Sequence, residues 1–376
     1  MATKYSEGLL AVKFRVDKGG GRFLGGPFYY IENGMGKKWK WLGKLFAFFA
    51  CCAGALGIGT ITQVNGIASA AKSFFDPDDQ YMVSMFGNEY SWATIAAAVV
   101  VTVLAAMVII GGIQRIAKVS SIVVPFMAIA YVIICLAVVI YNHDRIPHAL
   151  SEIIQSAFGL KAVGGGAIGA MLIAMQKGVA RGIFSNESGL GSAPIAAAAA
   201  QTKEPVRQGL VTMTGTFVDT ICICTLTGLT VMTSGAYEYS VANGLEGVEV
   251  TAAAFGNGLP WAYSVGAFVL MAALAFFAFT TILGWDYYAE RSLEYLTDNM
   301  KAVMVYRWIY IAAVLIGPFL TVSAVWTIAD IFNAFMAIPN LIALLALSGV
   351  IVAETKSYFN RLNAGEIREF APKEKK

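Results

Sequence analysis

The chain has 376 residues, of which 57% are hydrophobic and only 14% are charged, with a formal net charge of +3 and a mean hydropathy of +0.65. Soluble domains carry about 25% charged residues, so this composition argues against a soluble globular fold, and we expect no nucleic-acid partner. The five cysteines all lie in apolar runs, and the chain has only two histidines. This pattern predicts free thiols rather than disulfides or a metal site.

Long charge-free runs predict membrane-spanning helices. Residues 119–143 and 331–353, for example, contain no Asp, Glu, Lys or Arg, and each run is long enough to cross roughly 30 Å of hydrocarbon as a helix. Backbone groups in lipid must bond to one another, which favours helices over open strands. The predicted fold class is therefore an all-α integral membrane protein with about 8–9 transmembrane spans. We expect a short extra helix near 323–336 and spans near 42–71, 92–113, 119–141, 163–184, 207–234, 258–289, 303–321 and 338–355.

The distribution of positive charge predicts the orientation of these spans. If the N-terminal segment is cytoplasmic, all 27 Lys and Arg residues except Lys72, Arg145 and Lys161 fall on the cytoplasmic side, as the positive-inside rule requires. The N-terminal run is not a signal peptide, and residues 1–16 are interpreted as the cytoplasmic end of a helix. Residues 357–376 are predicted to be a cytoplasmic tail. Two short outer segments, 146–158 and 249–256, are predicted to be interfacial helices without a direct functional role, or alternatively lids.

The first span contains the run GALGIGTITQVNG at residues 54–66. Gly57 and Gly59 permit close approach of another helix. Gln63 and Asn65 are amides within an apolar helix, so they are expected to face a partner or a cavity rather than lipid. For Asn65, a hydrogen bond between helices is as good an interpretation as ligand contact.

The fourth span is unusually rich in glycine. Its charge-free part, 162–176, is short for an uninterrupted crossing. A break in such a helix exposes backbone amides and carbonyls that suit a carboxylate and a cation, respectively. A flexible turn at the cytoplasmic mouth explains the glycine content equally well. The glycines are Gly164, Gly165, Gly166, Gly169, Gly178 and Gly182, and the run GIFSNESGLGSAP follows at 182–194.

Two acidic residues, away from the ends of predicted helices, are candidates for function. Asp219 belongs to the fifth span, and Asp330 lies before Pro339, which is expected to break the chain between two helices. An ionisable group at membrane depth is a functional candidate. For Asp219, the alternative is a structural ion pair with Lys177 or Arg181.

The sixth span contains the adjacent hydroxyl residues Thr280 and Thr281. Their oxygens suit a weakly bound cation such as sodium, whereas the alternative is hydrogen bonding to their own helix. Trp285 follows at the inner end, where an aromatic belt would also explain it. Enzyme motifs are missing: the sequence has no Walker loop, no HExxH motif and no GxSxG elbow, so neither ATP-driven transport nor an enzyme is expected.

Several runs of the sequence resemble the alanine or glycine:cation symporter family, also called sodium:alanine symporters. The resemblance covers essentially the whole chain, and its most specific stretch is RGIFSNESGLGSAPIAAAAAQTKEPVRQGLVTMTGTFVDT at 181–220. The other runs are GGPFYYIENGMG (25–36), IIGGIQRIAKVSSIVVPFMA (109–128), AFTTILGWDYYAE (278–290) and TIADIFNAFMAIPNLIALL (327–345).

The resemblance implies a single transporter domain over residues 1–376, with the inverted repeat of the leucine-transporter-type fold, in a bacterial or archaeal cell membrane. It implies symport of alanine or glycine with sodium, or in some members protons, without an organic cofactor. It further implies substrate contacts from Gln63 and Phe184, with Ser185 and Asn186 beside the helix break and Trp285 near the inner side of the pocket. By the same resemblance, Thr280 and Thr281 contribute to a sodium site.

One feature departs from the family pattern. Members begin with an extra helix and a discontinuous first core helix, whereas here residues 1–5 match the last part of the second core helix. The expectation is an N-terminally truncated inverted repeat. A non-transporting membrane remnant or partner subunit is therefore the alternative to a symporter.

Overall fold

The computed structural model describes residues 1–19, 22–85, 87–111, 113–158, 166–245 and 247–367. Gly164 and Gly165 of the fourth span and the last nine residues of the predicted tail lie outside them. The chain divides into two compact units. The first consists of residues 1–49, 187–217 and 334–376, and the second consists of residues 50–186 and 218–333. The prediction of a single domain over the whole chain stays a prediction.

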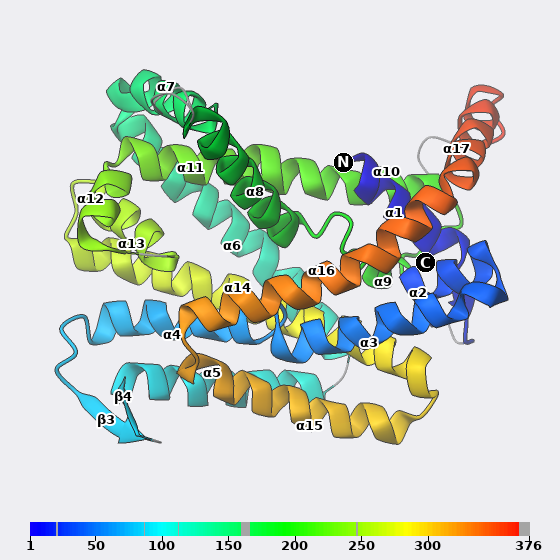
Figure 1. The fold of residues 1–376 in the computed structure, drawn as a ribbon, viewed down its shortest axis with the longest axis horizontal. Coiled ribbons are helices and arrows are strands. Elements are labelled where there is room, and N and C mark those ends of the chain that lie inside the picture. Colours follow the sequence, from blue (N-terminus) through cyan, green and yellow to red (C-terminus); the bar gives the residue numbers. More distant parts are fainter. Residues whose placement is uncertain (20–21, 86, 112, 159–165, 246, 368–376) are drawn as a thin grey trace. The chain divides into compact units, whose positions relative to one another are not determined.

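The first unit is built around the contact between two helices, α1 and α10 (Figure 1). A Cβ atom added to Gly8 would lie 2.6 Å from the Thr212 hydroxyl oxygen, so only glycine permits this approach. Arg15 donates hydrogen bonds of 2.6–2.9 Å to the carbonyls of Ala198, Ala200 and Thr202, which follow a short helix. These bonds satisfy acceptors left free at a helix end. Its elements are α1 (Ala2–Lys13), β1 (Val16–Asp17), β2 (Phe23–Leu24), α2 (Pro27–Tyr30), the π-helical η1 (Ile31–Met35), the 3₁₀ turn η2 (Lys37–Trp39), α9 (Ala193–Ala197), α10 (Pro205–Thr216) and α17 (Ser348–Asn363), with the start of α3 (Lys40–Leu56) and the end of α16 (Val322–Ala346).

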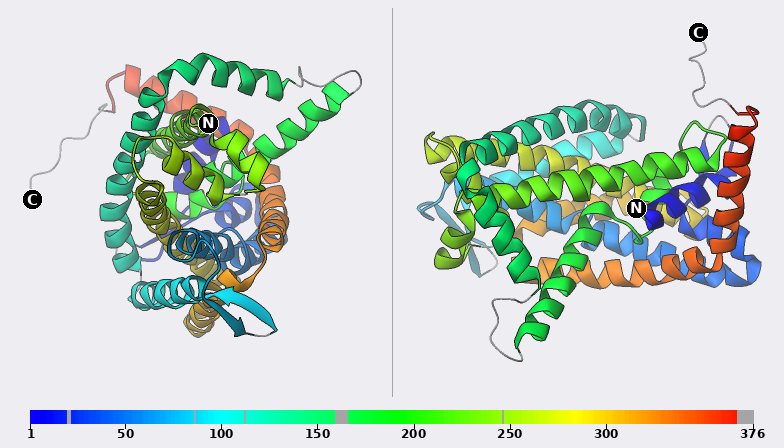
Figure 2. Two further views of the ribbon diagram at one scale, coloured as in Figure 1. Left: turned by 90° about the vertical axis from the view of Figure 1, so that its left-hand side faces the viewer. Right: turned by 90° about the horizontal axis from the view of Figure 1, so that it is seen from above.

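The second unit is a bundle of long helices in which α14 packs against α4, α6 and α13, and α5 packs against α4 and α15 (Figure 2). Glycines permit the closest approach: a Cβ atom on Gly59 would lie 2.5 Å from the Trp285 Cβ atom, and one on Gly54 would lie 2.8 Å from the Ala289 Cβ atom. The close helix contact predicted for Gly59 is confirmed. Besides the remainder of α3 and α16, its elements are α4 (Ile61–Phe75), β3 (Met82–Met85), β4 (Asn88–Ser91), α5 (Trp92–Ile110), α6 (Ile113–Tyr141), η3 (His143–Arg145), α7 (Ile146–Ala157), α8 (Gly166–Asn186), η4 (Phe217–Ile223), α11 (Cys224–Thr233), α12 (Ala236–Asn243), α13 (Val248–Asn257), α14 (Tyr263–Thr297), α15 (Met300–Ile316) and η5 (Gly317–Phe319).

Large apolar side chains are exposed along the helices of the second unit. Val100 and Met107 on α5 and Phe126 and Ile133 on α6 are each more than half exposed. Water would make this surface unfavourable, whereas lipid covers it. Among the described residues, seven helices are long and apolar enough to cross a membrane, namely 37–75, 92–110, 119–141, 205–233, 263–297, 300–319 and 323–346.

The prediction of two separate helices around Pro339 is wrong. A single helix, α16, runs from Val322 to Ala346 with Pro339 inside it, and α17 is a separate helix after it. Proline removes one backbone donor, but neighbouring helices and local adjustment make it tolerable within a membrane helix. The predicted short helix at 323–336 and the first part of the predicted span at 338–355 form one helix, α16, which is a candidate span, and α17 is not among the candidate spans.

The fourth span is interrupted later than its glycines predict. Helix α8 continues through Gly169, Gly178 and Gly182 to Asn186. The left-handed residues follow, at Glu187 (φ 55°), Gly189 (φ 88°) and Gly191 (φ 82°). In the first unit, a Cβ atom at Gly191 would lie 2.6 Å from Pro27 and 2.7 Å from Phe46. The segment 187–192 therefore needs glycine for both its backbone angles and its packing.

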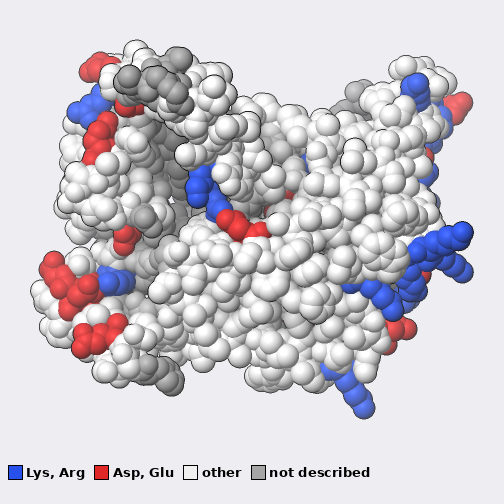
Figure 3. Space-filling view, in the orientation of Figure 1, with Lys and Arg blue, Asp and Glu red and all other residues white. Residues whose placement is uncertain are grey.

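The predicted outer helices are confirmed as α7 and α13. The two-stranded antiparallel pair β3–β4 was not predicted, and neither was α12. Asp78, Asp79 and Glu89 are exposed around the hairpin, and Figure 3 shows acidic side chains gathered at this end of the second unit. The positive-inside rule assigns this end to the outer side.

Candidate functional site: a polar cavity among membrane helices

A cavity of about 470 Å³ lies within the second unit. Its volume falls in the range of about 300–1,000 Å³ typical of small-molecule sites. The cavity includes Gln63 and Phe184, which the sequence predicts to lie together. Its described lining residues are Thr62, Gln63, Asn65, Gly66, Ser69, Phe184, Gly244, Gly247, Val248, Glu249, Leu274, Ala278, Val325 and Trp326.

The interruption between α3 and α4 positions Gln63. Helix α3 ends at Leu56 and α4 begins at Ile61. The Thr60 hydroxyl donates to the Gly54 carbonyl at 2.9 Å, which satisfies an acceptor at the end of α3. One helical turn further on, Gln63 donates from Nε2 to the Ile58 carbonyl at 3.0 Å. This bond fixes the amide at the cavity, beside the broken helix.

The hydrogen-bond interpretation of Asn65 is confirmed, whereas ligand contact by this residue stays a prediction. Its Nδ2 atom donates to the Leu320 carbonyl at 3.0 Å and lies 3.4 Å from the Gly317 carbonyl. Asn65 therefore links α4 to the segment that follows α15. The same residue lines the cavity. A buried amide with such bonds holds the cavity wall in place.

Phe184 belongs to an aromatic and ionic contact between α8 and α16. Its ring centroid lies 4.8 Å from that of Trp326, and the Arg181 guanidinium carbon lies 4.3 Å from the Trp326 ring centroid. Arg181 also donates to both carboxylate oxygens of Asp330, at 2.6 and 2.7 Å. The alternative that paired Asp219 with Arg181 is therefore wrong, because Arg181 pairs with Asp330.

Asp219 lies instead in the π-helical segment η4. It accepts hydrogen bonds of 2.9 Å from the Ser185 hydroxyl at both carboxylate oxygens. Asn186 donates to the Thr220 hydroxyl, also at 2.9 Å. Single π-helical turns often occur at functional sites. Ser185 and Asn186 thus bind the π-helical segment, and neither belongs to the described cavity lining.

The structure places Thr280, Thr281 and Trp285 outside the described cavity lining. Thr280 donates to the Phe277 carbonyl at 2.9 Å, and Thr281 donates to the same carbonyl at 3.0 Å. These bonds match the alternative that the two hydroxyls bond to their own helix. Each hydroxyl oxygen still has lone pairs that can accept from another group or contact a cation. Trp285 is buried in the close contact with Gly59.

Glu249 is the one charged side chain among the described lining residues. The other polar groups are amides and hydroxyls, and the remaining wall is apolar or aromatic. Such a lining suits a neutral molecule that has both positive and negative groups. In the described part of the chain, no cluster of three or more His, Cys, Asp or Glu side chains is arranged to hold a metal ion.

Among the hydroxyl, charged and aromatic lining residues, four were missed by the sequence reasoning: Thr62, Ser69, Glu249 and Trp326. Thr62 and Ser69 are seven positions apart on α4, and this spacing places them on one helix face. Trp326 precedes Asp330 by four residues on α16, which is again one face. Helical periodicity around Asp330 would have found Trp326, whereas Thr62 and Ser69 lie one and six positions from Gln63 and do not share its helix face.

Replacing Asp330 with Asn is expected to disturb the cavity wall more than the overall stability. The pair with Arg181 is partly exposed, with side-chain exposures of 48% and 40%, and exposed pairs contribute about 1 kcal/mol or less. Loss of the pair releases the α8–α16 contact that holds Phe184 at the cavity wall. We expect weaker binding of a small ligand at the cavity, with a nearly unchanged melting temperature. Equal ligand affinity in the variant and the unchanged protein would contradict this role.

A bundle of lipid-facing helices around a polar cavity is the arrangement typical of multi-pass membrane transporters. The sodium:alanine symporter family matches residues 1–372 of this chain. The chain belongs to this family, whose members are multi-pass cell-membrane proteins.

Three relatives illustrate the similarity. An uncharacterized transporter of Haemophilus influenzae is 50% identical over 96% of this chain and 75% of its own length. The sodium/alanine symporter AgcS of Methanococcus maripaludis is 42% identical over 98% of this chain and 76% of its own length. The amino-acid carrier protein AlsT of Bacillus subtilis is 35% identical over 97% of this chain and 72% of its own length.

Proposed function

We propose that this protein carries alanine across the cell membrane together with sodium, using the cavity of the second unit as the substrate site. The observation that supports the proposal best is that Gln63, Asn65 and Phe184 line the same cavity. Family membership and the 42% identity to a sodium/alanine symporter support the choice of substrate and cation. Glycine is a further substrate in this proposal.

The lining chemistry matches a small neutral amino acid. Amides both donate and accept hydrogen bonds, so Gln63 and Asn65 suit the carboxylate and the ammonium of a zwitterion. Glu249 adds a negative charge for the ammonium group. Ala278 and Leu274 provide apolar surface for a methyl side chain, and Phe184 and Trp326 provide an aromatic wall.

Sodium is proposed to bind near Thr280 and Thr281. Their hydroxyl protons are donated to the Phe277 carbonyl, which leaves the oxygen lone pairs as acceptors for a cation. The finer fold is part of the same proposal: an inverted repeat of the leucine-transporter type with eight or nine spans. The two helix interruptions, at 57–60 and 187–192, support it because such folds bind ligands at broken helices.

Uptake of labelled alanine by proteoliposomes, with and without an inward sodium gradient, tests the proposal. We expect gradient-dependent uptake, and we expect Gln63→Ala to lower uptake at limiting alanine about 10-fold or more. A hydrogen bond to a charged group contributes about 1.5–3 kcal/mol, which corresponds to at least that factor. Gln155→Ala is the matched control, because Gln155 lies on α7 and bonds only to Ser151 of the same helix. Alanine uptake that is independent of the sodium gradient would reject the proposal. A lack of any alanine uptake by the unchanged protein would reject it as well.

A further inference from the structure

Asp286 is a completely buried carboxyl group in α14. Neither of its carboxylate oxygens has a hydrogen-bond partner among the described residues. Buried polar groups are almost always hydrogen-bonded, and an unpaired buried charge costs several kcal/mol. The ionised form of Asp286 is therefore unfavourable unless nearby positive charge is free to balance it.

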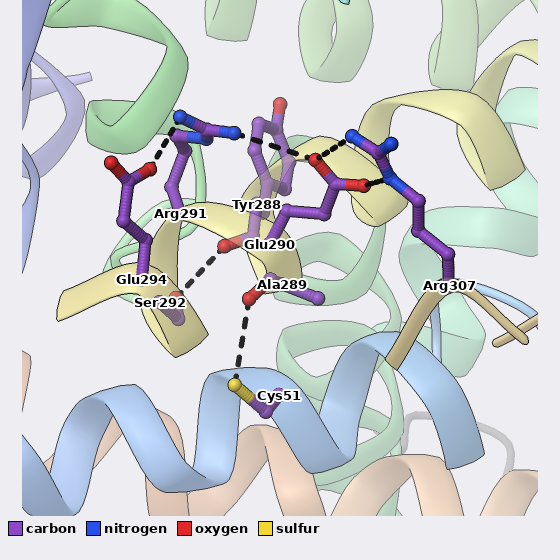
Figure 4. Close-up of polar contacts among 8 residues, drawn as sticks. All are labelled: Cys51, Tyr288, Ala289, Glu290, Arg291, Ser292, Glu294 and Arg307. Carbon is purple, nitrogen blue, oxygen red and sulfur yellow. Dashed lines mark hydrogen bonds and ion pairs between the residues drawn. The ribbon is translucent and has the colours of Figure 1, made fainter. Parts of the chain in front are cut away.

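The nearby positive charges are already engaged by other carboxylates (Figure 4). Arg307 of α15 donates to both oxygens of Glu290, with 3.0 Å between its Nη2 atom and Oε2. Arg291 donates to Glu294 at 2.5 Å and lies 3.4 Å from Glu290. The Nε atom of Arg291 is also unpartnered among the described residues, so this guanidinium acts through its terminal nitrogens. Among the residues that the structure describes here, three carboxylates face two guanidinium groups when every group is ionised, and the two oxygens of Asp286 are the ones without a hydrogen-bond donor.

The tyrosine hydroxyls near Asp286 do not neutralise it either. Asp286 acts electrostatically on Tyr306 and Tyr310 of α15. The Tyr306 hydroxyl donates to the Cys51 carbonyl at 2.7 Å, and the Tyr310 hydroxyl donates to the Ile282 carbonyl at 2.6 Å. A tyrosine has one proton to donate. The thiol of Cys51 is likewise directed to the Ala289 carbonyl, at 3.5 Å (Figure 4).

We propose that Asp286 is a proton-binding site: with a proton on its carboxyl group, the cluster of Asp286, Glu290, Arg291, Glu294 and Arg307 carries no net charge. A proton taken up from water converts the carboxylate into a neutral acid. An unpaired neutral hydroxyl costs about 1–3 kcal/mol, far less than an unpaired charge. A metal ion is a poor occupant, because the described residues around it form no metal-binding cluster of acids, cysteines or histidines.

The proton site has a direct structural connection to the broken helix at the cavity. Trp285, the residue before Asp286, packs against Gly59 at the interruption between α3 and α4. The Tyr310 hydroxyl lies 3.3 Å from the Gly59 carbonyl and bonds to Ile282, one turn before Asp286. A change of charge at Asp286 thus acts on the segment that positions Gln63. Only this consequence rests on the proposed transport function.

Infrared spectroscopy of the purified protein tests for the proton directly. At pH 7 we expect an absorption of protonated carboxyl groups, part of which is lost in Asp286→Asn. The difference between the two proteins isolates Asp286, since every other protonated carboxyl contributes equally to both. Asp298→Asn is the matched control, because Asp298 is an exposed acid at the C-terminal end of the same helix and should leave the spectrum unchanged.

Two results would overturn the proposal. Identical spectra for the unchanged protein and Asp286→Asn would show that Asp286 is ionised, and loss of the absorption on adding sodium at constant pH would show that it binds the metal ion instead. The melting temperature gives a second measurement. A neutral amide in place of a neutral acid should change it by only a few degrees, whereas a large drop would show that an ionised carboxylate is required. None of these readouts needs transport, so failure of alanine uptake would affect the proposed function alone.

Discussion

Replacing Arg307 with Met is expected to lower the free energy of unfolding by about 3–5 kcal/mol, because removal of one partner leaves a buried charge uncompensated. Glu290 has only 6% of its side chain exposed, and Arg307 has 24% exposed. Arg307 supplies two donors to this carboxylate, and Arg291 is shared with Glu294. Thermal or denaturant unfolding in detergent measures the loss.

A double variant and a matched pair identify the cause of this loss. Adding Glu290→Gln to the Arg307→Met variant removes the orphaned charge and should recover part of the stability. Arg361→Met removes a similar two-bond pair with Glu204, but Arg361 is 37% exposed. That control should lose far less stability, because water screens an exposed pair. Equal losses in the two arginine variants would contradict burial as the reason.

The first unit is expected to become less stable as the pH rises from about 5 to about 8. Glu7 of α1, a helix that is not among the candidate spans, is fully buried, and burial raises its pKa to about 7, although Lys4 and hydrogen bonds act in the opposite direction. Its Oε1 atom accepts from the backbone amides of Gly189 and Gly191 and, at 2.7 Å, from Asn340. Its other oxygen has no partner among the described residues.

The sign follows from the direction of this pKa shift. Between the unfolded pKa of 4.5 and the folded value of about 7, the folded state binds more protons, so the free energy of unfolding falls with increasing pH. The full difference is about 3 kcal/mol and is reached above pH 7. Glu7→Gln should flatten this dependence, whereas Glu354→Gln, which removes the partly exposed pair with Lys13, should retain it. Melting curves at pH 5 and pH 8 measure the difference, and an unchanged slope in Glu7→Gln would exclude Glu7 as its source.

Much of the secondary structure could be predicted because membrane spans depend on local composition. The span predicted at 119–141 is one of the candidate spans found, and the span predicted at 207–234 differs by only one or two residues at each end. Hydrocarbon excludes charge over a fixed thickness, so an uncharged run of sufficient length identifies its own helix. The positions of Gln63 and Phe184 at one cavity agree with the family resemblance.

Partners and helix interruptions were harder to predict. A proline predicts a break from local stereochemistry, yet α16 continues through Pro339 because surrounding helices support it. Glycines at 169, 178 and 182 predict an interruption within the span, but α8 continues through all three. The interruption begins only at Glu187. Asp330 is 149 residues from Arg181 and much farther along the chain than Asp219, and only the fold brings Arg181 to Asp330.

The sequence by itself determined that this protein is a helical membrane transporter of the sodium:alanine symporter family, because hydropathy and long family motifs are properties of contiguous residues. Only the tertiary structure decided which residues surround the cavity and which carboxyl groups lack a partner. Asp286 illustrates the difference: its position in an apolar helix is visible in the sequence, whereas the engagement of both nearby arginines by other acids is not. The charge balance of a buried group depends on residues brought together from separate helices, and hydropathy along the chain does not contain that information.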